Sequence, residues 1–381
     1  MEYVFRKKSA AFLASVVDAI GHFIFRRRDQ TLPKPDSILI VRLDHLGDIL
    51  GCTGIPQSLK GSYPSARIIF LTSSSGKALL ENNPYVDEVL VYDAPWFRRL
   101  PAGQAGPGSG RGKNSFWQTV AELKKRNISL GLSLRGDARE NLMLFLAGVR
   151  FRIGYGITGL GFLLHRELSY RPKLPESQHS LDVLRALGIR RELLPPSLFL
   201  SDEENTEVKQ RLSEAAGRKV VGIQFDAGSP AKTWPEANRA AFLKEATNKF
   251  PEAQFLFLGS DPSMAGWLNK KLNGGSSVNL VGKTTIRELL VCLKSCHYFI
   301  GPDSGPAHMA SALEVPTLFL YSGTNLFEKW RPEAENADFL RNPVDCSPCH
   351  LTVCNVEGHP CMTGIKPERV VRWLGERLRG E

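Results

Sequence analysis

Long apolar runs are missing from this sequence. The N-terminal apolar stretch, Ser9 to Phe25, is interrupted by Asp18 and His22 and falls short of the roughly 20 residues that a membrane-spanning helix needs. Signatures of zinc-finger, RNA-recognition and homeodomain modules are missing as well. The formal net charge of +10 favours acidic partners, and these absences rank nucleic acid below phosphorylated sugars and anionic lipid.

Cysteine is sparse outside one short segment. Three of the seven cysteines, Cys52, Cys292 and Cys296, are scattered, and an odd count in a large α/β chain does not indicate a disulfide-stapled secreted protein. The other four lie within sixteen residues: Cys346, Cys349, Cys354 and Cys361. Four thiolates suit a tetrahedral zinc or iron ion, and the first pair has finger spacing, although the complete spacing is not that of a standard finger. A structural metal, free thiols and a disulfide therefore stay open, with His350 and His359 as substitute ligands.

Residues 1–36 form a basic N-terminal segment. Two basic clusters, at residues 6–8 and 26–28, flank the apolar stretch. Helical spacing predicts one apolar stripe, made of Phe5, Phe12, Val16, Ile20 and Phe23. A helix with basic ends and an apolar face suits an anionic inner leaflet. A helix docked on the protein's own surface and a signal peptide are the alternatives, although no small-residue cleavage pattern stands out.

From residue 37 onward, strand and helix patterns alternate. This alternation predicts parallel βαβ units and therefore a doubly wound α/β protein. The predicted strands cover residues 37–43, 67–72, 86–92, 128–134, 220–224, 254–258, 297–300 and 317–321. A proline-bearing passage near residues 170–201 separates two lobes, and a Gly/Pro-rich stretch at 101–113 predicts a loop. We place an N-terminal lobe at 37–195, a C-terminal lobe at 196–345, and a cysteine-rich loop with a final helix at 346–381.

Doubly wound sheets bind ligands at the carboxyl ends of their strands. Four turns are predicted there, at residues 44–48, 226–234, 259–262 and 301–308. In the last, Ser304 can cap a helix that opens with Pro306, and Gly305 allows close approach. Such a helix start favours phosphate, although an ordinary βα turn would have the same composition.

The turn at residues 226–234 also has the character of an anion site. Ala227, Gly228 and Ser229 leave backbone N–H groups unobstructed, and Lys232 would place a charge on a diphosphate. The ending of a Walker loop is missing, and a plain loop beside a lysine is the alternative.

Two aspartates in these turns are candidates with simpler alternatives. Asp48 begins a helix, where it is either a cap or a general base that takes a proton from an attacking hydroxyl. Asp44 and His45 are close enough to couple to it. Asp261 either accepts hydrogen bonds from ribose hydroxyls or belongs to a surface turn.

Three runs carry a family resemblance: ILIVRLDHLGDIL from residue 38, DAGSPAKTWP from residue 226, and FIGPDSGPAHMASALEVPTLFLY from residue 299. They resemble glycosyltransferase family 9, the lipopolysaccharide heptosyltransferases, over roughly residues 37–375. The resemblance implies a GT-B fold, with two Rossmann-like lobes and an interlobe cleft. It also implies an inverting transfer from a nucleotide-sugar donor, commonly ADP-heptose, to a lipid-linked acidic glycan of the lipopolysaccharide core. The implied location is the cytoplasmic face of the bacterial inner membrane.

The resemblance also implies roles for single residues. Asp48 matches the family's catalytic base, Lys232 the lysine on the donor diphosphate, and Asp303 the aspartate on the donor sugar. The donor-binding set is completed by Gly47, Gly228, Ser229, Asp261, Ser304, Gly305, Pro306 and His308. No catalytic cofactor is implied, and no Asp-x-Asp pair stands where a metal-dependent transferase would need one. Some autotransporter-modifying relatives hold iron in a cysteine finger, which favours structural zinc or iron at the cysteine cluster.

Three departures from the family pattern concern the acceptor more than the chemistry. Asp226 occupies a place where relatives more often have a small residue or proline, and the N-terminal helix and the loop at 101–113 are additions. A transferase using another sugar nucleotide or a protein acceptor therefore stays possible. A catalytically inert nucleotide-sugar binding protein is the alternative from a different class.

Overall fold

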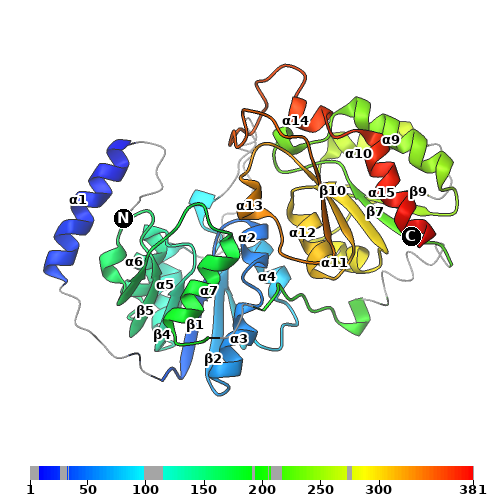
Figure 1. Cartoon of the computed structure of the whole chain (residues 1–381). Coiled ribbons are helices and arrows are strands. Elements are labelled where there is room, and N and C mark those ends of the chain that lie inside the picture. Colours follow the sequence, from blue (N-terminus) through cyan, green and yellow to red (C-terminus); the bar gives the residue numbers. More distant parts are fainter. Residues whose placement is uncertain are drawn as a thin grey trace. The chain divides into compact units, whose positions relative to one another are not determined.

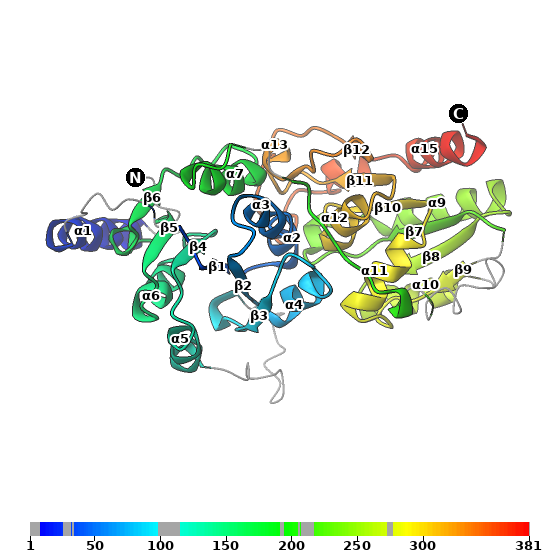
Figure 2. The same ribbon diagram turned by 90° about the horizontal axis from the view of Figure 1, so that it is seen from below.

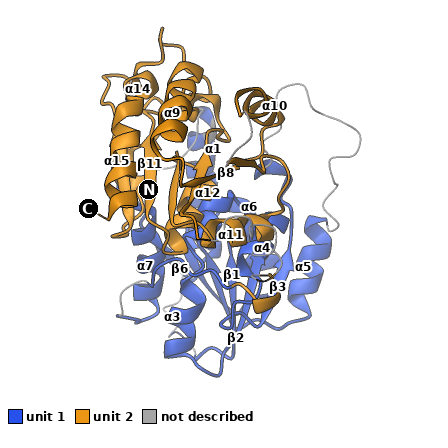
Figure 3. Ribbon diagram, turned by 90° about the vertical axis from the view of Figure 1, so that its right-hand side faces the viewer, with its two compact units in different colours: residues 1–199 blue, residues 200–381 orange. Residues whose placement is uncertain are grey.

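The chain divides into two compact units, residues 1–199 and 200–381 (Figure 3). The computed structural model describes residues 8–25, 32, 34–97, 115–190, 194–204, 206, 217–272 and 277–380. The predicted loop at 101–113 lies outside these residues, and so do the basic clusters flanking the N-terminal helix, apart from the backbone of Lys8.

Each unit contains one six-stranded sheet (Figure 1). The first sheet comprises β1 (Ser37–Val41), β2 (Arg67–Thr72), β3 (Glu88–Val91), β4 (Leu130–Ser133), β5 (Phe151–Tyr155) and β6 (Arg166–Leu168). The second comprises β7 (Val220–Gln224), β8 (Gln254–Leu258), β9 (Ser277–Asn279), β10 (Tyr298–Pro302), β11 (Thr317–Tyr321) and β12 (Ala337–Arg341).

The two sheets have the same topology. Their orders are β3-β2-β1-β4-β5-β6 and β12-β11-β10-β7-β8-β9, and the strand pairs are parallel. Counted from its own first strand, each sheet therefore has the order 3-2-1-4-5-6 of the doubly wound dinucleotide-binding folds. The order reverses between β1 and β4 in the first unit and between β7 and β10 in the second. Ligands of such sheets bind outside the carboxyl ends of the strands at this reversal.

Helices cover both faces of the sheets (Figure 2). The first unit contains α1 (Lys8–Ile24), α2 (Leu46–Leu50), α3 (Ile55–Ser62), α4 (Ser74–Leu80), α5 (Phe116–Lys124), α6 (Ala138–Leu146) and α7 (Glu176–Ala186). The second contains α9 (Glu236–Lys249), α10 (Pro262–Lys271), α11 (Ile286–Lys294), α12 (Gly305–Ala312), α13 (Phe327–Trp330), α14 (Pro360–Thr363) and α15 (Pro367–Arg379). Of the helices described, none combines the length and apolar character that crossing a bilayer requires.

Strand β1 is buried on both of its faces. Ile38 and Ile40 pack in a core with residues of α3 and α7, whereas Leu39 and Val41 pack in another with residues of α5 and α6. Figure 2 shows these helix pairs on opposite faces of the sheet. Parallel strands that are covered on both faces have near-continuous apolar sequences, as SILIV does. Packing on both faces holds β1 in place and thereby fixes where the turn after Val41 begins.

The sequence predicted the central strands better than the edges. The expected strands at 67–72, 220–224, 254–258 and 317–321 are confirmed to the residue. Four strands were not predicted: β5, β6, β9 and β12. The strands β6, β9 and β12 lie at sheet edges and are partly exposed, so they lack the long apolar run that identified the others.

Gly54, before α3, offers a test of the packing that positions the end of β1. A Cβ at Gly54 would lie 2.4 Å from the carbonyl oxygen of Leu194 and 2.6 Å from that of Pro195. We expect Gly54→Ala to destabilise the protein by roughly 1–3 kcal/mol, because backbone atoms must move to admit the methyl group. Urea unfolding measures this. Gly51→Ala is the matched control, since its Cβ would meet its nearest atom at 3.6 Å. Equal midpoints for the two variants would contradict the packing argument.

Candidate active site

Charged side chains gather at the reversal of strand order in each unit. In the first unit, Arg42, Asp44 and Asp48 follow β1. In the second, Lys232 lies in the turn after β7 and Asp303 follows β10 directly. The predicted catalytic residues therefore occupy the positions at which doubly wound sheets bind ligands.

Arg42 is the centre of the group in the first unit. It is 2% exposed, and its Nε donates a hydrogen bond of 2.7 Å to Asp44 Oδ1. The same guanidinium lies 3.3 Å from Asp48 and 3.4 Å from Glu176. Arg135, after β4, pairs with the other oxygen of Asp44. Because a buried charge is costly without partners, this network fixes the positions of its members.

Asp48 has the environment of a general base. Burial raises its pKa to about 7, the negative charge of Asp44 adds to the rise, and the charge of Arg42 opposes it. Its side chain is 8% exposed, and its Oδ1 makes no hydrogen bond within the described chain although Arg42 is close. A base works best when its pKa is near the working pH. Asp48 lies in the first turn of α2, after the N-cap residue His45, so its charge is also placed to stabilise the start of the helix.

The sequence did not predict one further buried carboxyl group near Asp44, that of Glu140. Glu140 of α6 is fully buried, and burial together with the charges of Asp44 and Asp137 raises its pKa well above the usual range. Its Oε2 accepts a 3.4 Å hydrogen bond from Ser133 Oγ. No motif marks this residue, because it lies within a helix whose apolar pattern is ordinary.

Asp303 is the centre of the group in the second unit. It is 3% exposed, and Lys232 Nζ donates to its Oδ2 at 2.7 Å and to its carbonyl oxygen at 2.9 Å. His308 Nε2 lies 3.0 Å from Oδ1, and Asn325 donates to Oδ2 at 2.9 Å. Burial opposes ionisation, but the His308 hydrogen bond and the Lys232 charge hold the pKa of Asp303 well below its usual range. The structure thus brings together three of the predicted donor-site residues.

Lys232 uses only part of its hydrogen-bonding capacity on Asp303. An ammonium group has three N–H donors, and two of them go to Asp303. The side chain of Lys232 is 19% exposed. One donor is left for an anion, so the lysine can contact a diphosphate while Asp303 holds it in position.

The start of α12 differs from the prediction in one respect. Ser304 does not cap the helix: its hydroxyl instead donates a 2.6 Å hydrogen bond to Gln224 Oε1 at the end of β7. The helix begins at Gly305, one residue before Pro306. The capping expectation was wrong because a side-chain amide lay within reach of the hydroxyl. Because the N-cap side chain makes no hydrogen bond to the first turn, the free N–H groups there remain suited to an anion.

Asp226 connects two of the predicted turns. Its buried Oδ2 accepts hydrogen bonds from the N–H groups of Ser260, at 2.7 Å, and Asp261, at 2.8 Å. Gly259 has φ +148°, and a Cβ there would lie 2.2 Å from Asp226 Oδ1. Asp226 therefore joins the turn after β7 to the turn after β8, and Gly259 makes room for its carboxylate.

The remaining predicted donor residues have differing surroundings. Asp261 caps α10 by accepting from Ser263 N at 2.8 Å, which is the surface-turn alternative, and its contact with ribose stays a prediction. Gly228 is exposed, whereas the Ser229 hydroxyl donates to Thr352 O at 2.8 Å. Gly47 is exposed, and a Cβ there would meet no atom within 4 Å.

The cysteine loop, residues 346–361, packs against the donor turns. The carbonyl oxygen of Thr352 accepts from Ser229 and also from the N–H of Ala231 at 3.0 Å. His359 Nε2 lies 3.0 Å from Ala231 O, and the N–H of Cys349 donates to Gly323 O at 3.0 Å. The loop therefore supports the backbone immediately before Lys232.

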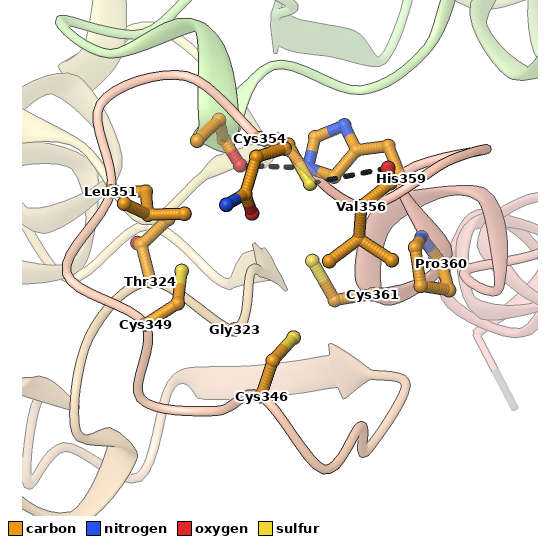
Figure 4. Close-up of a pocket in the computed structure, with 12 residues that line it drawn as sticks. Gly323, Thr324, Cys346, Cys349, Leu351, Cys354, Val356, His359, Pro360 and Cys361 are labelled. Carbon is orange, nitrogen blue, oxygen red and sulfur yellow. Dashed lines mark hydrogen bonds between the residues drawn. The ribbon is translucent and has the colours of Figure 1, made fainter.

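Four thiols surround a small cavity in this loop (Figure 4). Its volume is about 10 Å³, and Cys346, Cys349, Cys354 and Cys361 are among its lining residues. All four are free thiols, and burial raises the pKa of Cys361. Within the described chain, no three histidine, cysteine or acidic side chains are arranged to hold a metal ion. The structure therefore gathers the predicted ligands around one space without giving them coordination geometry.

Comparison with known proteins agrees with this fold. The family model "Glycosyltransferase family 9 (heptosyltransferase)" matches residues 117–359. Lipooligosaccharide heptosyltransferase 2 of Campylobacter jejuni is 29% identical over 43% of this chain, and the match spans about half, 52%, of that relative's length. Lipopolysaccharide heptosyltransferase 2 of Salmonella typhimurium is 24% identical over 90% of this chain and 99% of its own.

Among solved structures, the Escherichia coli ADP-heptose lipopolysaccharide heptosyltransferase II is similar in fold. The TM-score is 0.69 at 22% identity, and the likeness covers 89% of this chain and 97% of that one. The two doubly wound units confirm the predicted α/β class and its GT-B type. The chain belongs to glycosyltransferase family 9. The interlobe cleft stays a prediction.

The Lys232–Asp303 pair predicts an asymmetric effect on stability. We expect Lys232→Met to destabilise the protein by roughly 1–3 kcal/mol, because the buried carboxylate of Asp303 loses its cationic partner. Lys232→Met/Asp303→Asn should regain part of this loss, since the uncompensated charge is removed as well. Thermal unfolding measures both, with Lys244→Met, at an exposed position of α9, as the control. A double variant less stable than Lys232→Met would contradict the argument.

Proposed function

We propose that this chain is an inverting glycosyltransferase that moves a heptose from ADP-heptose to a lipopolysaccharide core acceptor. The observation that carries the proposal is the carboxylate of Asp48, whose pKa is raised to about 7 at the strand-order reversal of a family 9 chain. The names of the relatives support heptose as the sugar and lipopolysaccharide as the acceptor class. Lipooligosaccharide in the Campylobacter relative's name supports the same class.

The residues of the first unit supply the base. An acceptor hydroxyl would attack the anomeric carbon from the face opposite the diphosphate while Asp48 takes its proton. The new C–O bond forms as the bond from the anomeric carbon to the diphosphate oxygen breaks, so the configuration inverts. Arg42 keeps the Asp48 carboxylate in place, and its charge limits the rise in that pKa.

The residues of the second unit would hold the donor. Negative charge builds on the departing ADP, and fixed donors stabilise such charge in the transition state. The free N–H of Lys232, the backbone at Gly228 and Ser229, and the first turn of α12 are suited to this task. Asp303 orients Lys232 and, by the family resemblance, contacts the donor sugar with His308 nearby. No catalytic metal or other cofactor enters this scheme.

The acceptor class also suggests where the enzyme works. A lipopolysaccharide core precursor is a lipid-linked acidic glycan, and the net charge of +10 favours such a partner over a neutral one. We place the enzyme at the cytoplasmic face of the bacterial inner membrane, as a peripheral protein. Nucleic acid is not expected to bind.

Asp48 predicts the pH dependence of transfer. Only the carboxylate accepts a proton, so ADP release from ADP-heptose, with a core acceptor present, should decline as the pH falls below about 7. Asp48→Asn should slow release by roughly 10²–10⁴-fold and abolish this dependence. ADP affinity, measured by calorimetry, should stay unchanged. Asp202→Asn is the matched control, because its carboxylate is exposed.

Stability separates a lost base from a lost fold. Folding raises the pKa of Asp48 from 3.8 to about 7, so the folded chain binds this proton more tightly than the unfolded chain. The free energy of unfolding therefore falls as the pH rises from the lower of these two pKa values to the higher. Asp48→Asn should therefore unfold at a higher temperature than the wild type at pH 8. If Asp48→Asn releases ADP slowly but also unfolds at a lower temperature than the wild type, the slow release does not support Asp48 as the general base. Nucleotide binding without turnover on any acceptor would favour an inert binding protein.

We also propose that the cysteine loop binds a structural zinc or iron ion. The first Cys-x2-Cys spacing and the shared cavity support this proposal. Such an ion would act at a distance from the chemistry. It would hold the loop whose Thr352 carbonyl supports Ser229 and Ala231.

Metal analysis tests this part of the proposal. Purified protein should contain roughly one zinc or iron per chain, as expected for a four-thiolate site. Cys346→Ser/Cys349→Ser should lose the metal and bind ADP more weakly, because the support of the Lys232 turn is loosened. Cys292→Ser, which changes a buried thiol of α11, should keep both. A metal-free wild type with four titratable loop thiols would exclude the ion.

A further inference from the structure

Helix α1 presents its apolar side away from the protein. Phe12 is 71% exposed, Leu13 65%, Ile20 55%, Phe23 77% and Ile24 66%. Val16, Val17 and Phe25 are exposed as well, so α1 and the residue after it hold most of the exposed large apolar side chains of the described chain. Four members of the predicted apolar stripe are thus confirmed to face outward together.

The opposite side of α1 is fixed to the first unit by polar and small residues. Asp18 is 2% exposed, and its Oδ1 accepts a 2.7 Å hydrogen bond from the N–H of Leu160. His22 Nε2 lies 3.3 Å from Glu167 Oε2. Gly21 is packed so closely that a Cβ there would lie 2.2 Å from the ring of Phe162. The helix lies at the β6 end of the first sheet (Figure 2).

This polarity is the reverse of that in an ordinary surface helix. A helix that packs on its own domain buries the apolar stripe and exposes the polar face. In α1 the polar groups make the intramolecular contacts, so the stripe is available for something else. A contiguous exposed apolar patch of this kind marks an interaction surface. The sequence alternatives of a docked helix and a membrane-binding helix are therefore compatible with each other.

The charges at the two ends of α1 distinguish between two partners for its apolar face, a second copy of the helix and a lipid surface. In the sequence, Arg6 and Lys7 precede the helix, Lys8 is its first residue, and Arg26, Arg27 and Arg28 follow it. Two copies of α1 packed face to face, in either direction, would bring basic ends together. An anionic surface complements both ends at once, because basic residues near an anionic bilayer are attracted to it. At 17 residues, α1 is also too short to span a bilayer.

We propose that α1 binds the surface of an anionic lipid bilayer, with its axis along the surface and the Phe12–Phe23 face among the acyl chains. The inference rests on the proposed function only in its choice of a membrane as partner. The docked polar side of the helix would then hold the first unit at the bilayer, where a lipid-linked acceptor is anchored. The lipid contact is a property of α1 and requires no substrate.

Vesicle sedimentation of the full chain, without substrates, tests the proposal. Wild-type protein should sediment with vesicles of phosphatidylcholine and phosphatidylglycerol and only weakly with phosphatidylcholine alone. Ile20→Glu/Phe23→Glu should lower the partition coefficient by about a hundredfold or more, because burial of each large apolar side chain contributes roughly tenfold or more. Trp117→Glu, which changes an exposed apolar residue of α5, is the matched control and should sediment like the wild type.

Two further measurements make each outcome decisive. Circular dichroism and thermal unfolding should show that Ile20→Glu/Phe23→Glu is folded, since both side chains are exposed. Light scattering without lipid should give the same mass for this variant and the wild type. A wild type that ignores anionic vesicles, or a variant that binds them equally, overturns the proposal. A dimer that the substitutions dissociate overturns it in favour of a second copy of the chain. Transfer in detergent, measured in parallel, reports separately on the proposed function.

Discussion

Buried charge that must be compensated is the constraint on which this protein's candidate site depends. A charged group inside a protein persists only when opposite charges and hydrogen bonds surround it. Arg42 in the first unit and Asp303 in the second are each nearly inaccessible to solvent, and each is surrounded by partners of the opposite sign or by donors. The partners are the residues to which chemistry is assigned. Their positions are therefore set by electrostatics as well as by backbone geometry.

The two units use this constraint with opposite consequences for protonation. Around Asp303, cationic and hydrogen-bonding partners keep the carboxylate ionised in spite of burial. Around Asp48, burial and a neighbouring carboxylate outweigh Arg42, and the affinity for a proton rises. A permanently ionised aspartate suits the holding of a lysine, whereas one that titrates near neutrality suits proton transfer. The same side chain is thereby fitted to different tasks by its neighbours.

Much of this arrangement could be predicted from the sequence, for identifiable reasons. Runs such as SILIV and QFLFL are buried on both faces, so their apolar continuity located the central strands and the turns that follow them. Edge strands such as β9 carry no such run. Contacts between distant segments were equally hidden: neither Glu140 beside Asp44 nor Asn325 on Asp303 follows from local spacing. The capping role of Ser304 failed for the same reason, because its partner Gln224 is 80 residues away.

The way α1 is attached changes what its removal would mean. Asp18 accepts the backbone N–H of Leu160, and Gly21 and Phe25 lie against the ring of Phe162. A chain shortened past this helix would leave an amide without its acceptor and uncover an aromatic ring. The truncated chain would lose the apolar face of α1 but expose the ring of Phe162 instead. Aggregation or weak lipid binding of such a chain would therefore not test whether α1 binds lipid. Substitutions to a charged residue on the outward face leave the contacts of Asp18 and Gly21 with the first unit intact. The outward face of α1 can therefore be changed without changing the face that attaches the helix to the protein.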